Sequence, residues 1–538
     1  MSLSPIRRRT ALVLVALLPL FAISCPGSGS PWRSALYPAS WQPGYADAQG
    51  RFLHDFSYAG YRNGEAAIPD APPLPSFDVS AYGADPTGQT DSTGALQASI
   101  NAAVDAGGGV VKVPQGIFRC DGRLLVQGSN VILRGAGRDS TRLYFTQSTS
   151  MANRSHLTFQ GNVTRGADIP LAQDGQNGSN QVIVNDATSL SPGDEVAVGW
   201  TISEAFVAEH GMTGTWQAFN GQWRPFFRRT VVAVDSNVIT LDVPLRYPAR
   251  LRDGASLRKE TGYLRECGLE RLSLSNAVDW DAAWSMYRVH LLKMIDTEDS
   301  WIRDVGSFAS PLPDADGYHL QNCGFGLVDC KRITVADCRL EKAQNRGTGG
   351  CGYLFEISRS NEVLLRDCAG IDGRHNFIQN WDFGTTGCVF LRCRSAGGRN
   401  LLGKNDPIGV PAYSEYHHSL AMACLVDSCI LDDGWYGGNR QDESSGAGHS
   451  VTQSVYWNTS GKGIVKSWQY GWGCVIGTRG VTVAAGLSDI HALLGSAQGT
   501  APEDWTEGIG SGQTLEPSSL YEDQLARRRV DLQPTFYR

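Results

Sequence analysis

Polar side chains that could carry out acid–base chemistry are concentrated between residues 374 and 479. The segment "GRHNF" at 373–377 places a guanidinium, an imidazole and a carboxamide side by side, and four of the ten histidines lie within 375–449. Imidazole accepts and releases protons near neutral pH, and guanidinium pairs well with carboxylates. This stretch therefore predicts proton transfer beside a bound acidic group.

The alternation of a strand constrains how these side chains point. If 373–377 is extended, Arg374 and Asn376 share one face while His375 and Phe377 share the other. Phe377 is expected to point inward, which makes His375 either a buried, hydrogen-bonded support or the base. The role of base then moves toward the later histidines. Our catalytic candidates are Arg374, His375, Asn376, His418 and His449.

One reaction that fits is β-elimination on a uronic acid polymer. It requires one group to neutralise the substrate carboxylate, a second to remove the C5 proton and a third to protonate the leaving oxygen. Arg374 and Asn376 are the predicted neutralising groups, and His418 or His449 is the predicted base. We expect a metal-independent lyase without a cofactor, because Arg, Asn or a protonated His can neutralise the carboxylate without a metal. No histidine stands at ligand spacing beside the two C-x4-C pairs, which argues against a zinc site there.

Paired carboxylates would instead indicate a glycoside hydrolase. The order of three acidic or histidine motifs resembles that of the polygalacturonases: Asp406, then residues 432–433, then "GHS" at 448–450. The match is imperfect, because the first motif reads "KND" here and only "VK" stands near the expected fourth motif. A third interpretation is a non-catalytic surface lipoprotein that binds glycan. The candidate substrate-binding residues are Lys404, Asp406, His417, Asp433, Arg440, Trp457, Asn458 and Lys466, with Trp216 and Arg224 as a sugar platform in an earlier segment.

Several of these residues also fit a purely structural role. Asp433 fits a turn, Trp457 fits the core with Asn458 in a turn, and Lys466 fits a solvated lysine. Trp216 equally fits the core of its own segment. Only one of the two adjacent histidines at 417–418 can face the substrate if that segment is a strand.

The elements that position this stretch begin with residues 77–118. This segment starts with a short strand and a Gly/Asp turn. An amphipathic helix follows, and its apolar side carries Ala95, Ile100, Ala103 and Val104. The helix ends at "GGG", before the strand "VVKVP". This segment resembles the opening of the pectate lyase superfamily. The resemblance implies an all-β protein, a right-handed parallel β-helix whose N-terminal end is capped by a helix.

Internal repetition supports the same fold. Strand-like segments start at 301, 333, 363, 389 and 425, and each combines an alternating apolar pattern with a polar bend and a small apolar residue. Stacked coils would place these small residues in one inward column, so the cysteines are expected to fill the core rather than to form disulfides. The column consists of Val305, Cys338, Cys368, Cys393 and Cys429.

The chain divides into six predicted parts. They are a signal peptide at 1–25, an extended lead-in at 26–75, the N-terminal cap and first coils at 76–140, a small antiparallel β insertion at 141–262, the coils with the site at 263–480 and a C-terminal cap at 481–538. A helix near 520–525 is expected to dock on the last coil and to protect its sheet edge.

The N-terminal 25 residues indicate export. Three arginines, an apolar run and a small residue before Cys25 are typical of a secretory signal, and "AISC" resembles a bacterial lipobox, which implies a lipid on Cys25 and membrane attachment. We expect a secreted protein or an outer-membrane or cell-surface lipoprotein. A net charge of -7 with pI near 5.8 gives no support for a nucleic-acid partner, and we expect a monomer acting on an acidic polysaccharide.

The polar stretch and the tail also resemble one group of proteins. These segments together resemble exported, pectate-lyase-like β-helix proteins. The segments are "RHN", a histidine before "SLA", "GHS", "WN" and the C-terminal "PEDW" and "SLYEDQL". This resemblance implies action on a polysaccharide without fixing which one.

Overall fold

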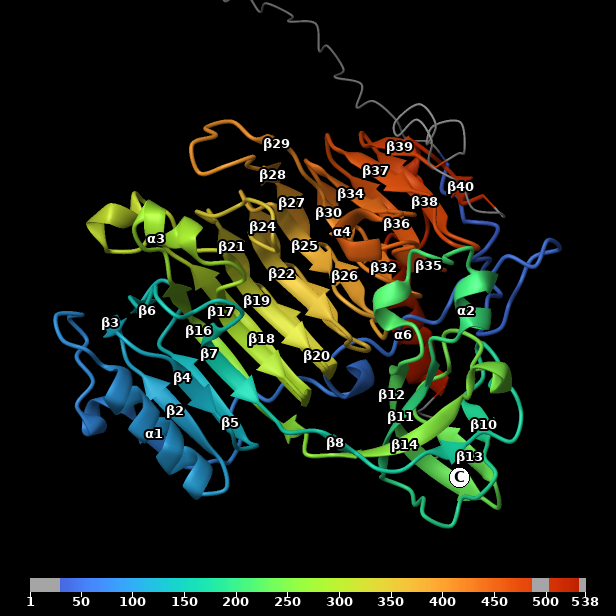
Figure 1. The fold of residues 1–538 in the computed structure, drawn as a ribbon, viewed down its shortest axis with the longest axis horizontal. Helices are drawn as coiled ribbons and strands as arrows, with labels where there is room; N and C mark the ends of the chain where they lie inside the picture. Colours follow the sequence, from blue (N-terminus) through green and yellow to red (C-terminus); the bar gives the residue numbers. More distant parts are fainter. Residues whose placement is uncertain (1–29, 486–502, 532–538) are drawn as a thin grey trace, which may run out of the picture.

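The computed structural model describes residues 30–485 and 503–531, and its strands stack in parallel along one axis (Figure 1). Ten of them form one face of the stack, which we call the site sheet. All neighbours in it pair in parallel. In spatial order they are β4 (Leu124–Val126), β7 (Ser155–Gln160), β17 (His290–Ile295), β19 (Cys323–Val328), β22 (Tyr353–Ser358), β25 (His375–Gln379), β30 (Ser414–Tyr416), β34 (Gly434–Gly437), β37 (Ile464–Ser467) and β39 (Thr482–Ala484).

A 19-stranded parallel sheet forms the remaining faces of the coils. The chain alternates between this sheet and the site sheet, so the predicted parallel β-helix is confirmed. The strands are β1 (Ser76–Asp78), β2 (Gly109–Val113), β3 (Gly116–Cys120), β5 (Val131–Gly135), β6 (Thr141–Phe145), β15 (Leu264–Arg265), β16 (Gly268–Ser275), β18 (Thr297–Ser307), β20 (Lys331–Ala336), β21 (Arg339–Glu341), β23 (Leu364–Arg366), β24 (Ala369–Ile371), β26 (Val389–Leu391), β27 (Arg394–Ala396), β32 (Leu425–Asp427), β33 (Ile430–Leu431), β36 (Val455–Ser460), β38 (Cys474–Arg479) and β40 (Trp505–Glu507).

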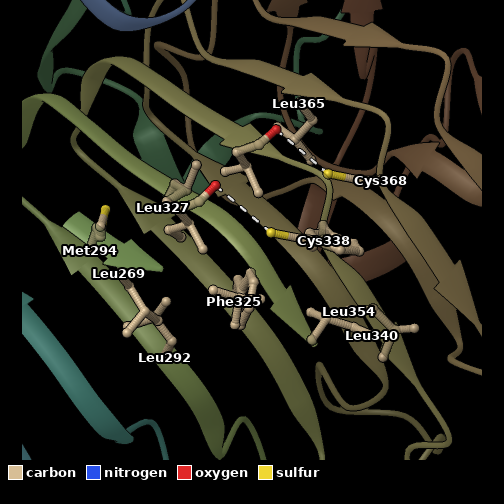
Figure 2. Close-up of a cluster of buried hydrophobic side chains, with 14 of the residues drawn as sticks. Leu269, Leu292, Met294, Phe325, Leu327, Cys338, Leu340, Leu354, Leu365 and Cys368 are labelled. Atoms are coloured by element: carbon tan, nitrogen blue, oxygen red, sulfur yellow. Dashed lines mark hydrogen bonds between the residues drawn. The ribbon is translucent and has the colours of Figure 1, made fainter. Parts of the chain in front are cut away.

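The core lies inside the coils and contains the predicted column of small residues. Val305, Cys338, Cys368, Cys393 and Cys429 are all buried in it, and Figure 2 shows Cys338 and Cys368 packed among leucines. The twelve described cysteines are free thiols and all are buried. The repeated cysteines are therefore core residues, as the spacing of the repeats predicted.

A column of left-handed residues marks the bend before each of these core positions. The φ angles at these bends are 51° at Asp304, 55° at Asp337, 55° at Asp367, 49° at Arg392 and 55° at Ser428. Short polar residues such as Asp and Asn tolerate this conformation best. Each coil therefore turns at the same place. The backbone conformation of the turn, and not strand alternation, determines where the side chain at the bend points.

An antiparallel domain is inserted between the first coils and the rest. Because β6 and β7 pair with coil strands, the insertion runs from β8 to β14 and does not start at residue 141 as expected. Its elements are β8 (Thr164–Arg165), β9 (Ile169–Pro170), β10 (Gln181–Ile183), β11 (Glu195–Thr201), α2 (Glu204–Glu209), β12 (Trp223–Asp235), β13 (Val238–Leu241) and β14 (Ser256–Thr261).

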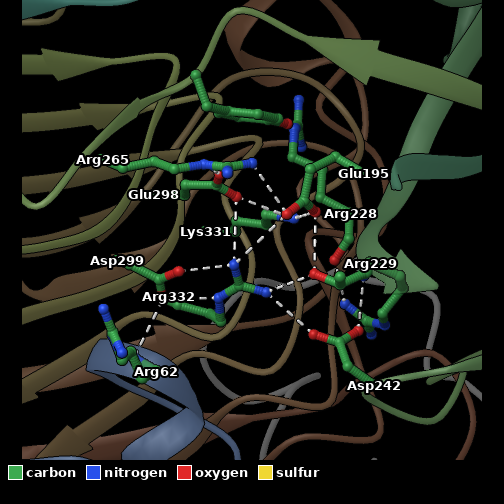
Figure 3. A network of polar contacts seen from close by, with 12 residues as sticks. Arg62, Glu195, Arg228, Arg229, Asp242, Arg265, Glu298, Asp299, Lys331 and Arg332 are labelled. Carbon is green, nitrogen blue, oxygen red and sulfur yellow. Dashed lines mark hydrogen bonds and ion pairs between the residues drawn. The ribbon is translucent and has the colours of Figure 1, made fainter. Parts of the chain in front are cut away.

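Buried charges join the insertion to the coils (Figure 3). Lys331 and Arg332 contact Glu298 at 3.1 and 3.2 Å, and both also pair with carboxylates of the insertion, among them Asp242 at 3.0 Å from Arg332. Arg228 pairs with a carboxylate of the coils. Buried ions are costly unless they are paired, so this network fixes the insertion in one position.

Helices cover two parts of the β-helix. Helix α1 (Thr93–Asp105) packs against β1, β2 and β4 and caps the N-terminal end, as predicted. Helix α6 (Leu520–Asp531) does not dock on the last coil. Together with the lead-in residues Tyr37 and Phe56, Leu520 covers the outer side of β23, β26, β32 and β36 through an apolar cluster. The expected position of this helix was therefore wrong.

The expected leader and the lipid-bearing Cys25 lie outside the described residues. Among the residues that the structure describes, no helix is long and apolar enough to cross a membrane.

Candidate active site

One row of outward residues runs along the site sheet. Phe325, Phe355 and Phe377 point into the core, so the neighbouring positions face away from it. The strand register aligns these outward positions from coil to coil as Lys293, Gly326, Glu356, Ile378, Glu415, Tyr436 and Lys466.

Two hollows lie on this face. The first, which we call the arginine pocket, has a volume of about 590 Å³. The second, which we call the lysine pocket, has a volume of about 450 Å³ and includes Lys466, Tyr413 and Tyr436. The two meet at a buried cluster, because His417 lines the arginine pocket while its partners Glu415 and Arg440 line the lysine pocket.

The buried cluster is built around the carboxylate of Glu415. The Glu415 Oε1 atom is contacted by Nε2 of His375 at 3.2 Å, by Nη1 of Arg440 at 2.9 Å and by Nδ1 of His417. His375 begins β25, and Glu415 lies at the centre of β30 on the next coil. These groups therefore come from adjacent parallel strands, although the register places Glu415 opposite Ile378 and not opposite His375. The side chains of Glu415, His375 and His417 are each less than a tenth exposed.

The arginine pocket gathers cationic, aromatic and proton-transfer groups. Its lining includes Arg288, Tyr353, Arg374, Trp381 and His418. Nη1 of Arg374 donates to the Gly347 carbonyl at 3.0 Å, and Nη2 of Arg288 pairs with Glu356 at 2.8 Å. The pocket therefore places two guanidinium groups beside imidazole and phenol side chains.

Trp381 is held in an exposed position at the edge of this pocket. Its side chain is 42% exposed, and its φ of 43° falls in the left-handed region that bulky residues rarely occupy. The ring lies 4.4 Å from His418 and 5.9 Å from Phe219 of the insertion, measured between centroids. Strained residues of this kind concentrate at ligand-binding sites, and the aromatic face is suited to a sugar ring.

Burial determines the charge state of the histidines. It lowers the pKa of His375 to about 3 and that of His418 to about 4, and it also lowers the pKa of His417. Burial alone would raise the pKa of Glu415, but Arg440, His375 and His417 outweigh it and hold that pKa well below the usual range. The cluster thus combines two imidazoles of lowered pKa with a carboxylate and a guanidinium.

The predicted neutralising pair of Arg374 and Asn376 is separated. Asn376 is fully buried, and its amide donates to Asp433 at 2.9 Å and to the Ala396 carbonyl at 2.9 Å. Asp433 also accepts from the backbone of Gly398 and Gly434. Asn376 and Asp433 therefore stabilise a turn between coils, and the anion-binding role predicted for Asn376 is corrected.

Two further candidates lie on a hairpin away from both hollows. Lys404 is exposed and pairs with Asp281 at 2.7 Å, close to helix α3 (Trp280–Ser285). Asp406 accepts hydrogen bonds from three backbone amides of its own loop, including Gly409 at 2.9 Å. The loop joins β28 (Arg399–Asn400) to β29 (Val410–Pro411), and Asp406 shapes it. The paired-carboxylate arrangement of Asp406 with Asp433 is thus not formed.

Another group of candidates lies in the insertion or between the insertion and the coils. Trp216 is 1% exposed, and its ring packs 5.0 Å from Phe383 in the cluster between insertion and coils. His449 faces the same interior, with its ring 5.0 Å from that of Tyr470. Arg224 pairs with Asp382 at 2.9 Å at the base of the insertion. The predicted sugar platform of Trp216 and Arg224 and the predicted base His449 are corrected accordingly.

Trp457 and Asn458 lie on the opposite side of the coils from the site sheet. Trp457 is completely buried beneath the C-terminal segment, and its indole donates to the Pro517 carbonyl at 3.0 Å. Asn458 has a φ of 50° and continues the column of left-handed bends, with its amide bonded to the Ser518 carbonyl. Neither is available to a ligand on the site sheet.

Several residues of the site were missed by sequence reasoning. Glu415 stands between the aromatic residues of "YSEYHH" but was not assigned a role, although a lone carboxylate beside two histidines is a usable signal. Arg288 and Tyr353 come from other coils, and their positions follow from the strand register. Trp381 follows β25 within the polar stretch itself, but no motif linked it to the site.

Comparison with known proteins gives a partial match at the N-terminal end. Residues 76–211 match the family described as rhamnogalacturonase A/epimerase, pectate lyase-like. Alginate lyase 7 of Azotobacter vinelandii is 43% identical over 72 residues, which is 12% of this chain and 8% of that protein. Mannuronan C5-epimerase AlgE3 of the same organism is 36% identical over 109 residues, 16% of this chain and 6% of that protein. The matches thus span less than a tenth of either relative.

Among solved structures, the tailspike protein gp49 of Pseudomonas phage LKA1 is similar, with 13% sequence identity, 76% of each chain covered and a TM-score of 0.37. The parallel coils described above establish the fold independently of this likeness. The chain is thus a parallel β-helix protein whose residues 76–211 are similar to the pectate lyase-like rhamnogalacturonase A/epimerase family.

Proposed function

We propose that the protein is a polysaccharide lyase that cleaves a uronic acid-containing glycan by β-elimination in the arginine pocket. The observation that carries the proposal is the gathering of Arg374, Arg288, His418 and Tyr353 around one open hollow on the site sheet. The short matches to an alginate lyase and to mannuronan epimerases support a uronate substrate, since both names refer to polymers of this class.

The proposed roles follow from charge and geometry. Arg374 neutralises the substrate carboxylate, which makes the C5 proton more acidic. His418 takes this proton: its Nε2 donates to the Ser444 carbonyl at 3.0 Å, which leaves Nδ1 as the basic nitrogen. The Ser419 hydroxyl at 2.9 Å from Nδ1 can turn toward the Ala447 carbonyl at 3.5 Å and release the lone pair.

The leaving oxygen needs a proton donor. Burial raises the pKa of Tyr353, so its phenol is protonated at neutral pH and can donate. Trp381 offers a face for the sugar ring at the open edge of the pocket. In this scheme the C5–H bond breaks, a C4–C5 double bond forms, the C4–O bond breaks, and the phenol proton passes to the departing oxygen.

The test is an assay of wild-type protein on polymannuronate, polyguluronate and polygalacturonate. We expect ultraviolet absorbance from an unsaturated uronide on at least one of them, loss of it in His418→Gln, and retention in His449→Gln, a matched change at a buried histidine away from the pocket. New reducing ends without this absorbance would select a hydrolase. Inverted C5 configuration in the product without chain cleavage would select an epimerase. If the polymers show no absorbance, no new reducing ends and no inversion, the proposal that the protein is an enzyme is refuted.

A further inference from the structure

The cluster of His375, Glu415 and His417 has the composition of a metal site. Each of the three offers a ligand atom, and these atoms lie within 4.8 Å of one another. Two imidazole nitrogens and one carboxylate oxygen form a donor set that first-row transition metals accept, with Zn²⁺ among them.

The hydrogen bonds of His375 leave a lone pair aimed at a carboxylate. Its Nδ1 lies 2.6 Å from the carbonyl oxygen of Tyr413, which can only accept, so Nδ1 carries the hydrogen and Nε2 has a lone pair. Nε2 faces the Glu415 oxygen at 3.2 Å and has no hydrogen-bond partner among the described residues. A carboxylate oxygen that faces an imidazole nitrogen in a buried site needs a proton or a metal ion between them, and a buried polar atom without a partner is a recognised sign of an ion.

The surroundings of the ligands also fit a metal. Histidines that bind metals usually donate their other N–H group to a backbone carbonyl or a similar acceptor, as His375 does to Tyr413. The other ring nitrogen of His417 lies 3.3 Å from the Ser444 hydroxyl. Two of the three ligands, His375 and Glu415, come from adjacent parallel strands, so the fold holds them on neighbouring coils.

We propose that His375, Glu415 and His417 bind one divalent first-row transition metal ion, which Zn²⁺ represents. This differs from the metal-free site expected from the sequence. The guanidinium of Arg440 contacts the Glu415 carboxylate and also Nδ1 of His417, so metal binding displaces it from that nitrogen. Its charge still offsets that of the carboxylate, so the charge of the ion remains to attract an anionic ligand. Resting on the proposed function, the ion would lie where the two pockets meet and would favour a uronate over a neutral sugar.

The test is direct metal binding to the purified full chain. Zn²⁺ alone is titrated by calorimetry after chelator treatment and dialysis, and we expect one ion per chain. Glu415→Gln and His417→Gln are each expected to weaken binding by at least about 100-fold, since even the loss of a supporting hydrogen bond costs about 10- to 100-fold. His418→Gln is the matched control, the same change one residue further on, and is expected to bind Zn²⁺ as the wild type does.

Two results would overturn the proposal: wild-type protein that binds no Zn²⁺, or equal binding by wild type and both ligand variants. If the ligand variants do not fold, Co²⁺ added to wild-type protein provides a second measurement. Visible absorbance typical of four- or five-coordinate Co²⁺ supports the site, and its absence contradicts it. Because His418→Gln is expected to lose cleavage and keep the metal, failure of the lyase proposal is distinguishable from failure of the metal site.

Discussion

A buried carboxylate beneath helix α6 should make the stability of the protein depend on pH. Asp427, at the end of β32, accepts hydrogen bonds from the Ser519 hydroxyl and the Tyr521 amide, both at 2.8 Å, and from the Ser428 hydroxyl at 2.9 Å. Its side chain is fully buried. Burial raises its pKa from an ordinary value of 3.8 to about 7, although these hydrogen bonds oppose the change.

The sign and size follow from linkage. The unfolded chain loses the Asp427 proton near pH 3.8, whereas the folded protein holds it until about pH 7. Between these values the folded state binds more protons, so its stability falls as pH rises and then levels off above pH 7. A gap of about three pH units corresponds to about 4 kcal/mol.

The perturbation is Asp427→Asn, whose side chain stays neutral at every pH. We expect the free energy of unfolding of the variant, relative to wild type, to increase by up to about 4 kcal/mol between pH 4 and pH 8. Urea denaturation followed by tryptophan fluorescence at both pH values measures it. Asp504, a second buried carboxyl with a pKa near 7, is present in both proteins and cancels in the difference. A stability difference that is the same at pH 4 and pH 8 would refute the reasoning.

Three further predictions concern the pocket and the core. Arg374→Met is expected to lower kcat/KM on a uronate polymer by about 10- to 100-fold, because a hydrogen bond to a charged group contributes about 1.5 to 3 kcal/mol. Arg224→Met, in the insertion, is the control, and an equal loss of kcat/KM in this variant would contradict the prediction. Trp381→Ala is expected to raise KM by about 2- to 12-fold with kcat nearly unchanged, from an aromatic contact of about 0.5 to 1.5 kcal/mol, and a change confined to kcat would argue against a stacking role. The twelve described cysteines should resist thiol labelling in the native protein and react in denaturant without a reductant, as mass spectrometry can follow; labelling that required a reductant would indicate disulfides.

The fold was predictable because each coil repeats one physical pattern. Alternating apolar residues and a small residue after the bend appear at 338, 368 and 393, and stacking converts this periodicity into an inward column. The insertion was recognised from its tight turns and alternating strands. Helix α6 was recognised as a helix but misplaced, since its sequence does not show which apolar surface it covers.

The site was predicted less completely because side chains near bends do not follow strand alternation. Asn458 was predicted to bind substrate, yet it occupies the left-handed bend that Asp and Ser fill on other coils. Asn376 likewise serves the turn that Asp433 completes. Arg374, His417 and His418 do line the arginine pocket, but Arg288 reaches it from an earlier coil, and nothing in the sequence marks the nearby Trp381 as part of it.

The charged base of the insertion has a consequence for the order in which the chain is made. Arg228 and Arg246 pair with carboxylates 101 and 116 residues further along the chain, and Trp216 donates to a carbonyl 231 residues later. During synthesis the insertion is complete before these partners exist, so its buried cations stay uncompensated until later coils are added. The insertion should therefore be among the first segments to be translated and among the last to reach native stability.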